Sequence, residues 1–302
     1  MPSILHLAYS NAAGVPGRWA EAHCSAGLDA WIVLEVADEY AFGTPAIIER
    51  WSHRWGELNG AADAIKRQIK SADVVMVYDS PFYLELVLGL GKPVLFRAFG
   101  SHSRQEPEQV KALLRSPLVR RATAGTGDLA LALGIPLVGC PFPELSPAEP
   151  EIPPRAVHSP SNRKLKGTQT IERLAERAGW ELEIVEDVTH AQVLARKHGC
   201  SLVIDQFGDP PHPDGIGVSA IEAMALGLPA IGRASGEVQR MYRELECPVV
   251  LVDSEEEFLS QLHRLHDDEE RRELGEEGRA WVRSFHDGAT RAREDLAALE
   301  SA

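Results

Sequence analysis

The chain has 302 residues, ordinary fractions of apolar and charged residues, and a formal net charge of −14 at pH 7. This length exceeds one small domain and fits two domains of about 150 residues each. The negative charge argues against duplex DNA, RNA or an anionic membrane as a partner of the whole surface, because those partners require a positive field. We therefore expect two globular domains and no nucleic-acid partner.

Cysteine usage and the amino terminus indicate a compartment. The cysteines at positions 24, 140, 200 and 247 are scattered, with no Cys-x-x-Cys pair, which is typical of free thiols in a reducing cytoplasm. The amino terminus has no basic region followed by an apolar core, and no apolar run approaches the roughly 18 residues of a transmembrane helix. The prediction is a cytoplasmic protein with no transmembrane segment.

The first half alternates short apolar runs with helical stretches. A strand at 4–8, a polar glycine-containing loop at 11–17 and a helix at 19–26 are the expected entry to a Rossmann-type unit. The elements predicted next are a strand at 30–36, helical stretches within 47–69, a strand at 74–78, a helix ending near 91, strands at 93–96 and 122–124, and a helical turn at 128–133. This half predicts a first Rossmann-like domain over residues 1–143.

The composition then shifts to a proline-rich stretch, with six prolines in residues 141–154. Proline removes backbone donors and fixes φ, so this stretch is predicted to be neither a buried strand nor a long helix. We interpret residues 144–155 as an interdomain linker.

Strands and helices alternate again after the linker. The predicted elements are a strand at 156–159, a helix at 167–178, a strand at 182–185, a helix at 190–198, a strand at 202–205, a helix at 218–226, a strand at 229–231, a helix at 237–243, a strand at 249–252, helices at 255–266 and 269–285, and a final helix after 288. Such alternation implies a parallel sheet with helices on both faces. The predicted fold class is α/β, with Rossmann-like domains at 1–143 and 156–287 and a ligand cleft between them. The helix at 288–302 is expected to pack back on the first domain.

The most specific motif starts at Asp214, in a loop after a predicted strand, and continues through a helix to Pro229. Its glycines allow a ligand to approach the backbone closely. The first N–H groups of the helix and the helix dipole favour a bound phosphate. Asp214 and Glu222 add two carboxylates, which are good acceptors for sugar hydroxyls. The segment therefore predicts a site for a phosphorylated sugar compound.

An acidic residue, seven others, a glutamate and then Ala-Met-Ala-x-Gly-x-Pro resembles the donor motif of retaining glycosyltransferases with the GT-B fold. That family usually has glutamate at the first position, where this chain has Asp214. The resemblance implies that Asp214 holds hydroxyls of the transferred sugar and that Glu222 holds the ribose of the nucleotide. The residues whose backbone it assigns to the sugar and diphosphate are Gly215, Ile216, Gly217 and Val218.

Residues 158–168 resemble the loop of the same family that ends in Lys-Gly and opens a helix. Chemistry needs positive charge here, because negative charge grows on the leaving diphosphate as the glycosidic bond breaks. Lys166 is expected to act as a point charge and Arg163 as a planar fork. The family's arginine commonly lies five positions before the lysine, where this chain has Ser161, so Arg163 is expected to take its place. The alternative is a solvated basic loop.

Two weaker resemblances complete the predicted donor side. Val188 and Thr189 are placed where the nucleotide base would pack, although a plain strand and its loop would look the same. Residues 11–17 resemble the glycine loop near the donor phosphates, with Gly14 as the expected contact.

On the acceptor side, residues 98–104 resemble the segment in which many relatives carry a histidine that faces the sugar. Phe99 stands at the histidine position of this chain and His102 at the position of an aspartate. We take His102 as a candidate catalytic residue. The alternative is a surface histidine or one with a structural hydrogen bond.

The resemblance implies a metal-independent retaining glycosyltransferase that moves a sugar from a nucleotide diphosphate sugar to an unknown acceptor, whether a saccharide, a lipid-linked compound or a small molecule. No Asp-x-Asp motif occurs, and no metal or cofactor is expected, because Lys166 and Arg163 would supply the positive charge. Two alternatives stay open. One is a non-catalytic nucleotide-sugar-binding protein, and the other is a different two-Rossmann enzyme, such as a GT-B-fold sugar epimerase.

Overall fold

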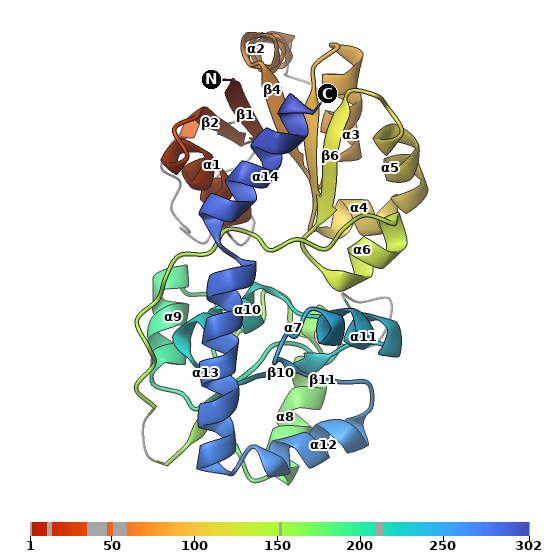
Figure 1. Ribbon diagram of the computed structural model, residues 1–302. Helices are drawn as coiled ribbons and strands as arrows, with labels where there is room; N and C mark the ends of the chain where they lie inside the picture. Colours follow the sequence, from red (N-terminus) through yellow and green to blue (C-terminus); the bar gives the residue numbers. More distant parts are fainter. Residues whose placement is uncertain are drawn as a thin grey trace. The chain divides into compact units, whose positions relative to one another are not determined.

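The computed structural model describes residues 2–10, 14–34, 47–50, 59–150, 153–208 and 214–301. Contacts divide the chain into two compact units (Figure 1). The first unit consists of Met1–Gly125, Leu129–Phe142 and His286–Ala302, and the second of Thr126–Asp128 and Pro143–Phe285. None of the described helices is both long and apolar enough to span a membrane.

The first unit contains one parallel sheet, sheet A, whose strand order is β3-β2-β1-β4-β5-β6. This is the strand order of the Rossmann fold. The strands are β1 (Ser3–Ala8), β2 (Asp29–Leu34), β3 (Ile47–Arg50), β4 (Val74–Tyr78), β5 (Val94–Ala98) and β6 (Val119–Ala124). The helices are α1 (Val15–Ser25), α2 (Asn59–Ser71), α3 (Pro81–Gly89), α4 (Ser101–Gln105), α5 (Pro107–Leu114), α6 (Gly127–Leu133), which begins within the second unit, and α14 (Gly288–Glu300).

The second unit contains a second parallel sheet, sheet B, with the order β11-β10-β9-β7-β8. The direction of chain progression reverses between β7 and β9, as in other doubly wound sheets. The strands are β7 (Arg155–His158), β8 (Glu181–Ile184), β9 (Leu202–Ile204), β10 (Ala230–Arg233) and β11 (Val250–Val252). The helices are α7 (Arg163–Lys166), α8 (Thr168–Arg177), α9 (His190–His198), α10 (Val218–Leu226), α11 (Gly236–Glu244), α12 (Glu255–Arg264) and α13 (Asp268–Phe285).

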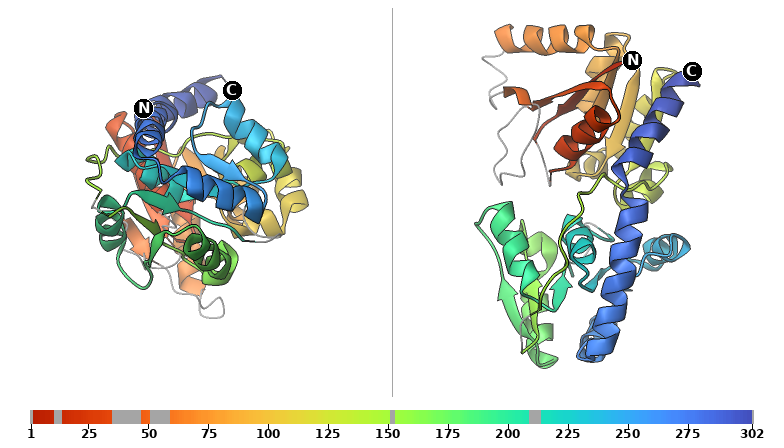
Figure 2. Two further views of the ribbon diagram at one scale, coloured as in Figure 1. Left: turned by 90° about the horizontal axis from the view of Figure 1, so that it is seen from below. Right: turned by 60° about the vertical axis from the view of Figure 1, so that its left-hand side comes forward.

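The predicted class, α/β with two Rossmann-like parallel sheets, is confirmed. Helices flank each sheet, as the two views of Figure 2 show. Two local predictions were wrong. Residues 47–50 form strand β3 rather than part of a helix, and two adjacent isoleucines there favour a strand because of their branching at Cβ. Helices α4 and α5 were not predicted, and strand β6 begins three residues earlier than the predicted start at 122.

Helix α14 is bound to sheet A by a fully buried carboxylate, that of Asp295. Both carboxylate oxygens accept hydrogen bonds from Nη2 of Arg97 on β5, and Arg121 on β6 donates to Oδ1 over 3.0 Å. His23 on α1 places its Nε2 3.3 Å from Oδ2. A charge this deeply buried is tolerated when it is paired and hydrogen-bonded, so Asp295 joins α14 to three other elements of the unit.

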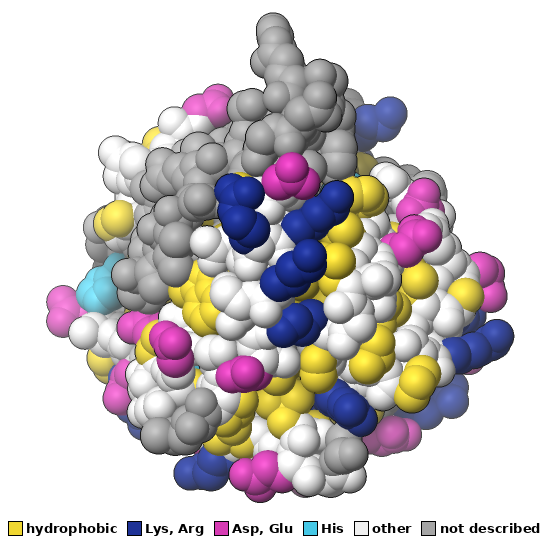
Figure 3. Space-filling view, turned by 90° about the horizontal axis from the view of Figure 1, so that it is seen from above, with side chains coloured by type: hydrophobic (Ala, Val, Ile, Leu, Met, Phe, Trp, Pro, Cys, Tyr) yellow, Lys and Arg dark blue, Asp and Glu magenta, His cyan; other side chains and the backbone are white. Residues whose placement is uncertain are grey.

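Lys and Arg side chains gather at the amino-terminal edge of sheet A, where Figure 3 shows them as a row beside hydrophobic side chains. Part of this edge is the last turn of α2, which contains Lys70. Lys92 donates to the carbonyl oxygens of Lys70 and Ala72, at 2.8 and 2.6 Å. Cations at the carboxyl end of a helix complement its dipole. Lys92 therefore has a structural role at the carboxyl end of α2, which lies at the edge of sheet A opposite to the carboxyl ends of the strands.

Candidate functional site

The reversal point of sheet B brings together segments that are far apart in sequence. Open α/β sheets bind ligands outside the carboxyl ends of the strands where the direction of progression reverses. At this point β7 leads into α7, which ends at Lys166, and β9 leads into Asp205 and Gln206. Helix α10 begins beside them, with Gly217 as its N-cap residue. The predicted donor segments of the second unit thus converge on one edge of the sheet.

Lys166 is the centre of this arrangement. Its Nζ donates to Oδ1 of Asp205 over 3.2 Å and to Oε1 of Gln206 over 2.8 Å. The other oxygen of Asp205 accepts the Gly217 N–H over 2.5 Å. The Asp205 side chain is almost fully buried, whereas the Lys166 side chain is 18% exposed. The ammonium is therefore fixed beside the amino end of α10 and remains accessible to a ligand.

Glycine is required at the start of α10 because the polar groups approach the backbone closely. A Cβ on Gly217 would lie 3.0 Å from Nζ of Lys166 and 3.1 Å from Oδ1 of Asp205. Gly215 has a φ of 113°, which favours glycine, and its carbonyl oxygen accepts from Nε2 of Gln206 over 2.6 Å. Sequence reasoning missed Asp205 and Gln206, although two polar residues directly after a buried strand are a usable signal.

Gly167 fixes the path of the chain after Lys166. It has a φ of 69°, and a Cβ there would overlap the backbone oxygen of Phe207. Gly179 has a similar φ of 76°, but a Cβ added to it would meet no other atom within 4 Å. Gly167→Ala is expected to lower the free energy of unfolding by about 2–5 kcal/mol, because overpacking adds to the left-handed penalty. Gly179→Ala should lose only about 1–2 kcal/mol from that penalty alone.

Urea unfolding of both glycine variants separates the two contributions. Equal losses for the two variants would show that the Gly167 backbone is not pressed against Phe207. A larger loss for Gly167→Ala, with weaker binding of nucleotide diphosphates, is expected because Lys166 must shift with its neighbour.

Glu222 lies one turn into α10 and is buried, with 3% of its surface exposed. Its Oε1 is 2.7 Å from Nε2 of His190, and its Oε2 accepts from Nζ of Lys197 over 2.6 Å. Burial alone would raise the pKa of this carboxyl. The charge of Lys197 and the hydrogen bond from His190 outweigh burial and hold the pKa of Glu222 at about 2. Glu222 is therefore an ionised acceptor at neutral pH.

Asp214 is half-buried at the start of the donor motif. Its Oδ1 accepts the backbone N–H of Ser235 over 2.7 Å. An ionised carboxylate has about four lone-pair sites, so this bond orients the side chain and leaves capacity for sugar hydroxyls. Asp214 is thus held in place by the segment that follows β10.

Arg163 forms ion pairs with two glutamates on the surface. Its guanidinium donates to Glu186 over 2.8 Å and to Glu172 over 2.9 Å, and 52% of the side chain is exposed. Arg163 therefore pairs with these two glutamates, whereas the partners of Lys166 are Asp205 and Gln206. The contact of Arg163 with the diphosphate stays a prediction. It would require these two surface ion pairs to break, and each such pair contributes little free energy.

Val188 and Thr189 precede the helix that contacts Glu222. Thr189 is the N-cap of α9 and forms a capping box with Gln192, which is the structural role of this sequence pattern. The next residue, His190, contacts Glu222. The predicted base-binding pair therefore directly precedes a residue that contacts the predicted ribose ligand, and its role stays a prediction.

The remaining predicted site residues belong to the first unit. Gly14 has a φ of 69° and is the N-cap of α1; positions 11–13 of the predicted loop lie outside the described residues. The His102 side chain is 54% exposed, and its Nδ1 is 3.9 Å from Oδ2 of Asp79. Asp79 also accepts the backbone N–H of His102 over 3.1 Å. Tyr9 contacts the His102 ring edge-on, with centroids 6.1 Å apart. His102 is therefore oriented at the carboxyl edge of sheet A.

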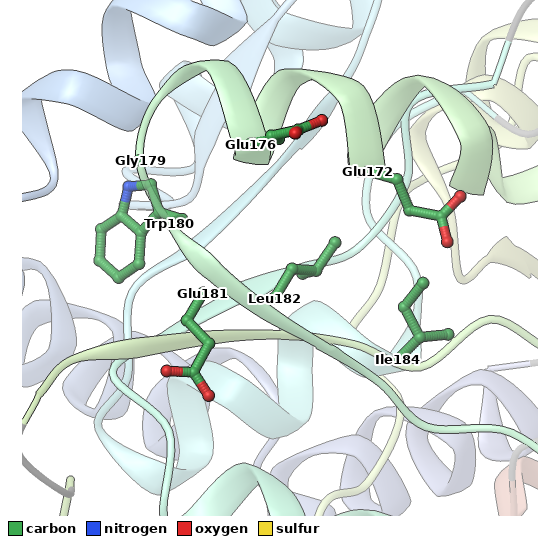
Figure 4. A pocket seen from close by; sticks show the side chains of 7 residues that line it. All are labelled: Glu172, Glu176, Gly179, Trp180, Glu181, Leu182 and Ile184. Atoms are coloured by element: carbon green, nitrogen blue, oxygen red, sulfur yellow. The ribbon is translucent and has the colours of Figure 1, made fainter.

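A pocket of about 360 Å³ lies between α8 and the edge strand β8 (Figure 4), and its lining includes Glu172, the partner of Arg163. Leu182 and Ile184 point from β8 toward α8, and the glutamates at 172, 176 and 181 line it. Like charges repel, so this acidic pocket is a poor site for a diphosphate. The edge of sheet B around Lys166 suits that ligand better.

Comparisons with known proteins agree with the geometry. Residues 162–297 match a family described as "Glycosyl transferase-like". The crystal structure of HepE from Anabaena, in complex with UDP-glucose, has the same fold, with a TM-score of 0.67 and 13% identity over 100% of both chains. The chain therefore has the GT-B fold, and residues 162–297 are similar to glycosyltransferases.

Two further solved structures share the fold of this chain. WaaG, involved in lipopolysaccharide biosynthesis, has a TM-score of 0.61 and 13% identity, over 96% of this chain and 99% of its own. The spinosyn forosaminyltransferase SpnP has a TM-score of 0.58 and 14% identity, over 98% and 99%. The search of curated protein sequences found no match to this chain. At these identities the structural likeness establishes the fold, and the family match covers the segment that holds the Lys166 cluster and α10.

Proposed function

We propose that the chain is a glycosyltransferase that transfers a sugar from a nucleotide diphosphate sugar, bound at the carboxyl edge of sheet B, to an acceptor hydroxyl. The observation that carries the proposal is the contact of Lys166, Asp205 and Gly217 at the amino end of α10. It joins an accessible ammonium to the positive end of a helix dipole, and this combination suits a diphosphate. HepE, with the same fold, was crystallised with UDP-glucose.

The leaving group is stabilised at this point. As the bond from the sugar to the phosphate breaks, negative charge grows on the diphosphate, and a fixed positive charge lowers the barrier. Lys166 supplies that charge without rearrangement, because Asp205 and Gln206 already hold it in position. We therefore propose that transfer proceeds without a metal, since this ammonium and the helix dipole do the work that a metal would do.

The two acidic residues of the motif are proposed to bind different parts of the donor. Asp214, held by Ser235, is proposed to accept hydroxyls of the transferred sugar. Glu222, ionised and further along α10, is proposed to accept the ribose hydroxyls. The family resemblance implies retention at the anomeric carbon. His102, whose side chain is 54% exposed at the carboxyl edge of sheet A, is proposed as a catalytic residue of the first unit.

Turnover tests this function. The purified chain is incubated with UDP-, GDP-, ADP- and TDP-glucose, with and without simple glycoside acceptors and with EDTA, and released nucleoside diphosphate is measured. Release that persists in EDTA, with a product whose anomeric configuration by NMR matches the donor, is the expected result. Binding without release or transfer would instead favour a nucleotide-sugar-binding protein. A donor of unchanged mass with an altered sugar would favour an epimerase.

A further inference from the structure

A second lysine of the donor unit, Lys197 on α9, is fully buried. Its Nζ donates to Oε2 of Glu222 over 2.6 Å, to Oγ of Ser219 over 2.9 Å, and to the carbonyl oxygen of Ser219 over 3.4 Å. An ammonium has three protons, and each has an acceptor here. The Ser219 hydroxyl also lies 3.1 Å from the hydroxyl of Ser159, in the loop after β7. Lys197 therefore joins α9 to the first turn of α10 and to the loop that leads to Lys166.

This ammonium contacts both parts of α10 that the donor is proposed to use. Ser219 belongs to the first turn of α10, where the N–H groups at the start of a helix lack intrahelical partners and are available to the proposed diphosphate. Glu222 belongs to the next turn and is the proposed ribose ligand. One buried cation thus fixes the spacing between the phosphate subsite and the ribose subsite.

A buried charge pair needs a reason other than stability. Replacing such a pair by well-packed apolar residues is often neutral or stabilising, because the desolvation cost offsets the attraction. A carboxyl at the position of Glu222 without a cation would be protonated at neutral pH. A protonated carboxyl carries its own hydrogen and accepts fewer hydrogen bonds than a carboxylate. The cation is therefore what makes Glu222 able to accept from two hydroxyl groups.

We propose that Lys197 is a positioning residue for the donor, which holds Glu222 as an ionised acceptor for the vicinal hydroxyls of a ribose. The proposal rests on the proposed function and deepens it. It specifies the substrate class as ribonucleoside diphosphate sugars in preference to 2′-deoxyribonucleoside ones. A 2′-deoxy donor would leave one lone pair of a buried carboxylate without a partner, and sites built in this way reject the analogue that lacks the hydroxyl.

The test must separate Lys197 from His190, because these two are the titratable groups that face Glu222 among the described residues. His190→Gln keeps a hydrogen-bond donor beside Oε1 and removes the imidazole. Lys197→Met is therefore made in that background, and its neighbour Arg196, whose side chain is 65% exposed, provides the control Arg196→Met. Binding of UDP-, GDP- and ADP-glucose, and of 2′-deoxy-UDP-glucose, is measured by calorimetry from pH 6 to pH 9.

With Lys197 present, donor affinity is expected to change less than about twofold over this range. In His190→Gln/Lys197→Met the affinity should rise about tenfold per pH unit up to a pKa near 8, because buried glutamates without a cation titrate there. The preference for the ribose form, at least about tenfold with Lys197 present, should shrink at neutral pH in this variant, since a neutral carboxyl no longer needs two donors. A flat profile with an unchanged preference would overturn the proposal.

A measurement without donor keeps the inference independent of the proposed function. In the double variant the pKa of Glu222 is expected to be higher in the folded state than in the unfolded state. The protonated carboxyl then stabilises the fold at low pH, and this stabilisation is lost as the pH rises from the unfolded-state pKa to the folded-state pKa. The Tm of the double variant should therefore fall between pH 6 and pH 9, and the fall should disappear when Glu222→Gln is added. Failure of every donor to bind, together with this falling Tm, would reject the proposed function and retain the role of Lys197 in ionising Glu222. A Tm that does not fall would reject that role.

Discussion

Asp295→Asn is expected to lower the free energy of unfolding of the first unit by about 3–5 kcal/mol, because removing one partner of a buried ion pair leaves the other charges uncompensated. Asp295 has no exposed surface and accepts from Arg97 and Arg121. Arg97 is itself 4% exposed and would remain charged in the variant. Urea unfolding followed by circular dichroism measures the loss.

Glu300→Gln is the matched control, because Glu300 lies on the same helix and is exposed. It should change stability by less than about 0.5 kcal/mol. A similar small change for Asp295→Asn would show that α14 is not held on sheet A by this carboxylate.

The pH dependence supplies a second readout for Asp295. Burial would raise the pKa of this carboxyl, but the charge of Arg97 and the hydrogen bonds from His23 and Arg97 outweigh burial and hold the pKa at about 2. The folded-state pKa is thus below the ordinary value of about 3.9, so the stabilisation is complete above about pH 4 and is lost as the pH falls through 2. The wild type should lose this contribution in acid, and Asp295→Asn should lack it at every pH.

Lys166→Ala is expected to reduce kcat by about 100- to 1,000-fold, the size of effect seen when one group that stabilises a developing negative charge is removed. The Lys166 side chain lies at the amino end of α10 and is partly exposed, so under the proposed function we expect it to act on the leaving diphosphate more than on the fold. Steady-state release of nucleoside diphosphate from the best donor of the glucose panel measures the change.

Lys164→Ala is the control for this variant, since Lys164 lies on the same short helix and is exposed. It should keep kcat within about twofold, because exposed charges at a distance are screened by solvent and salt. If the two variants lose activity equally, the positive charge of the loop matters as a whole and Lys166 has no special position.

The sequence predicted which segments meet at the carboxyl edge of sheet B because its signals there are local. Gly217 and Glu222 lie in one motif in which the glycine, the helix start and the acid follow from backbone geometry and spacing. Lys166 lies before a glycine that must adopt a positive φ, which is also a local requirement. The alternation of strands and helices likewise indicated two parallel sheets.

The residues that the sequence missed depend on distant contacts. Lys197 lies in a polar stretch at the end of a helix, and nothing in that stretch indicates that it is fully buried against α10. Asp295 looks like a surface acid of an amphipathic helix, but its partner Arg97 is 198 residues away. Strand β3 was taken for a helix because a short apolar run does not distinguish the two, and pairing with β2 decided the outcome.

The central claim is that the donor's diphosphate binds between Lys166 and the amino end of α10. A crystal structure of the chain with the nucleotide sugar that binds best in the glucose panel tests it most directly. The account predicts phosphate oxygens within hydrogen-bond distance of Nζ of Lys166 and of the first N–H groups of α10, with the ribose hydroxyls on Glu222. A nucleotide bound elsewhere, with Lys166 still paired to Asp205 and Gln206 and no phosphate beside it, would contradict the account.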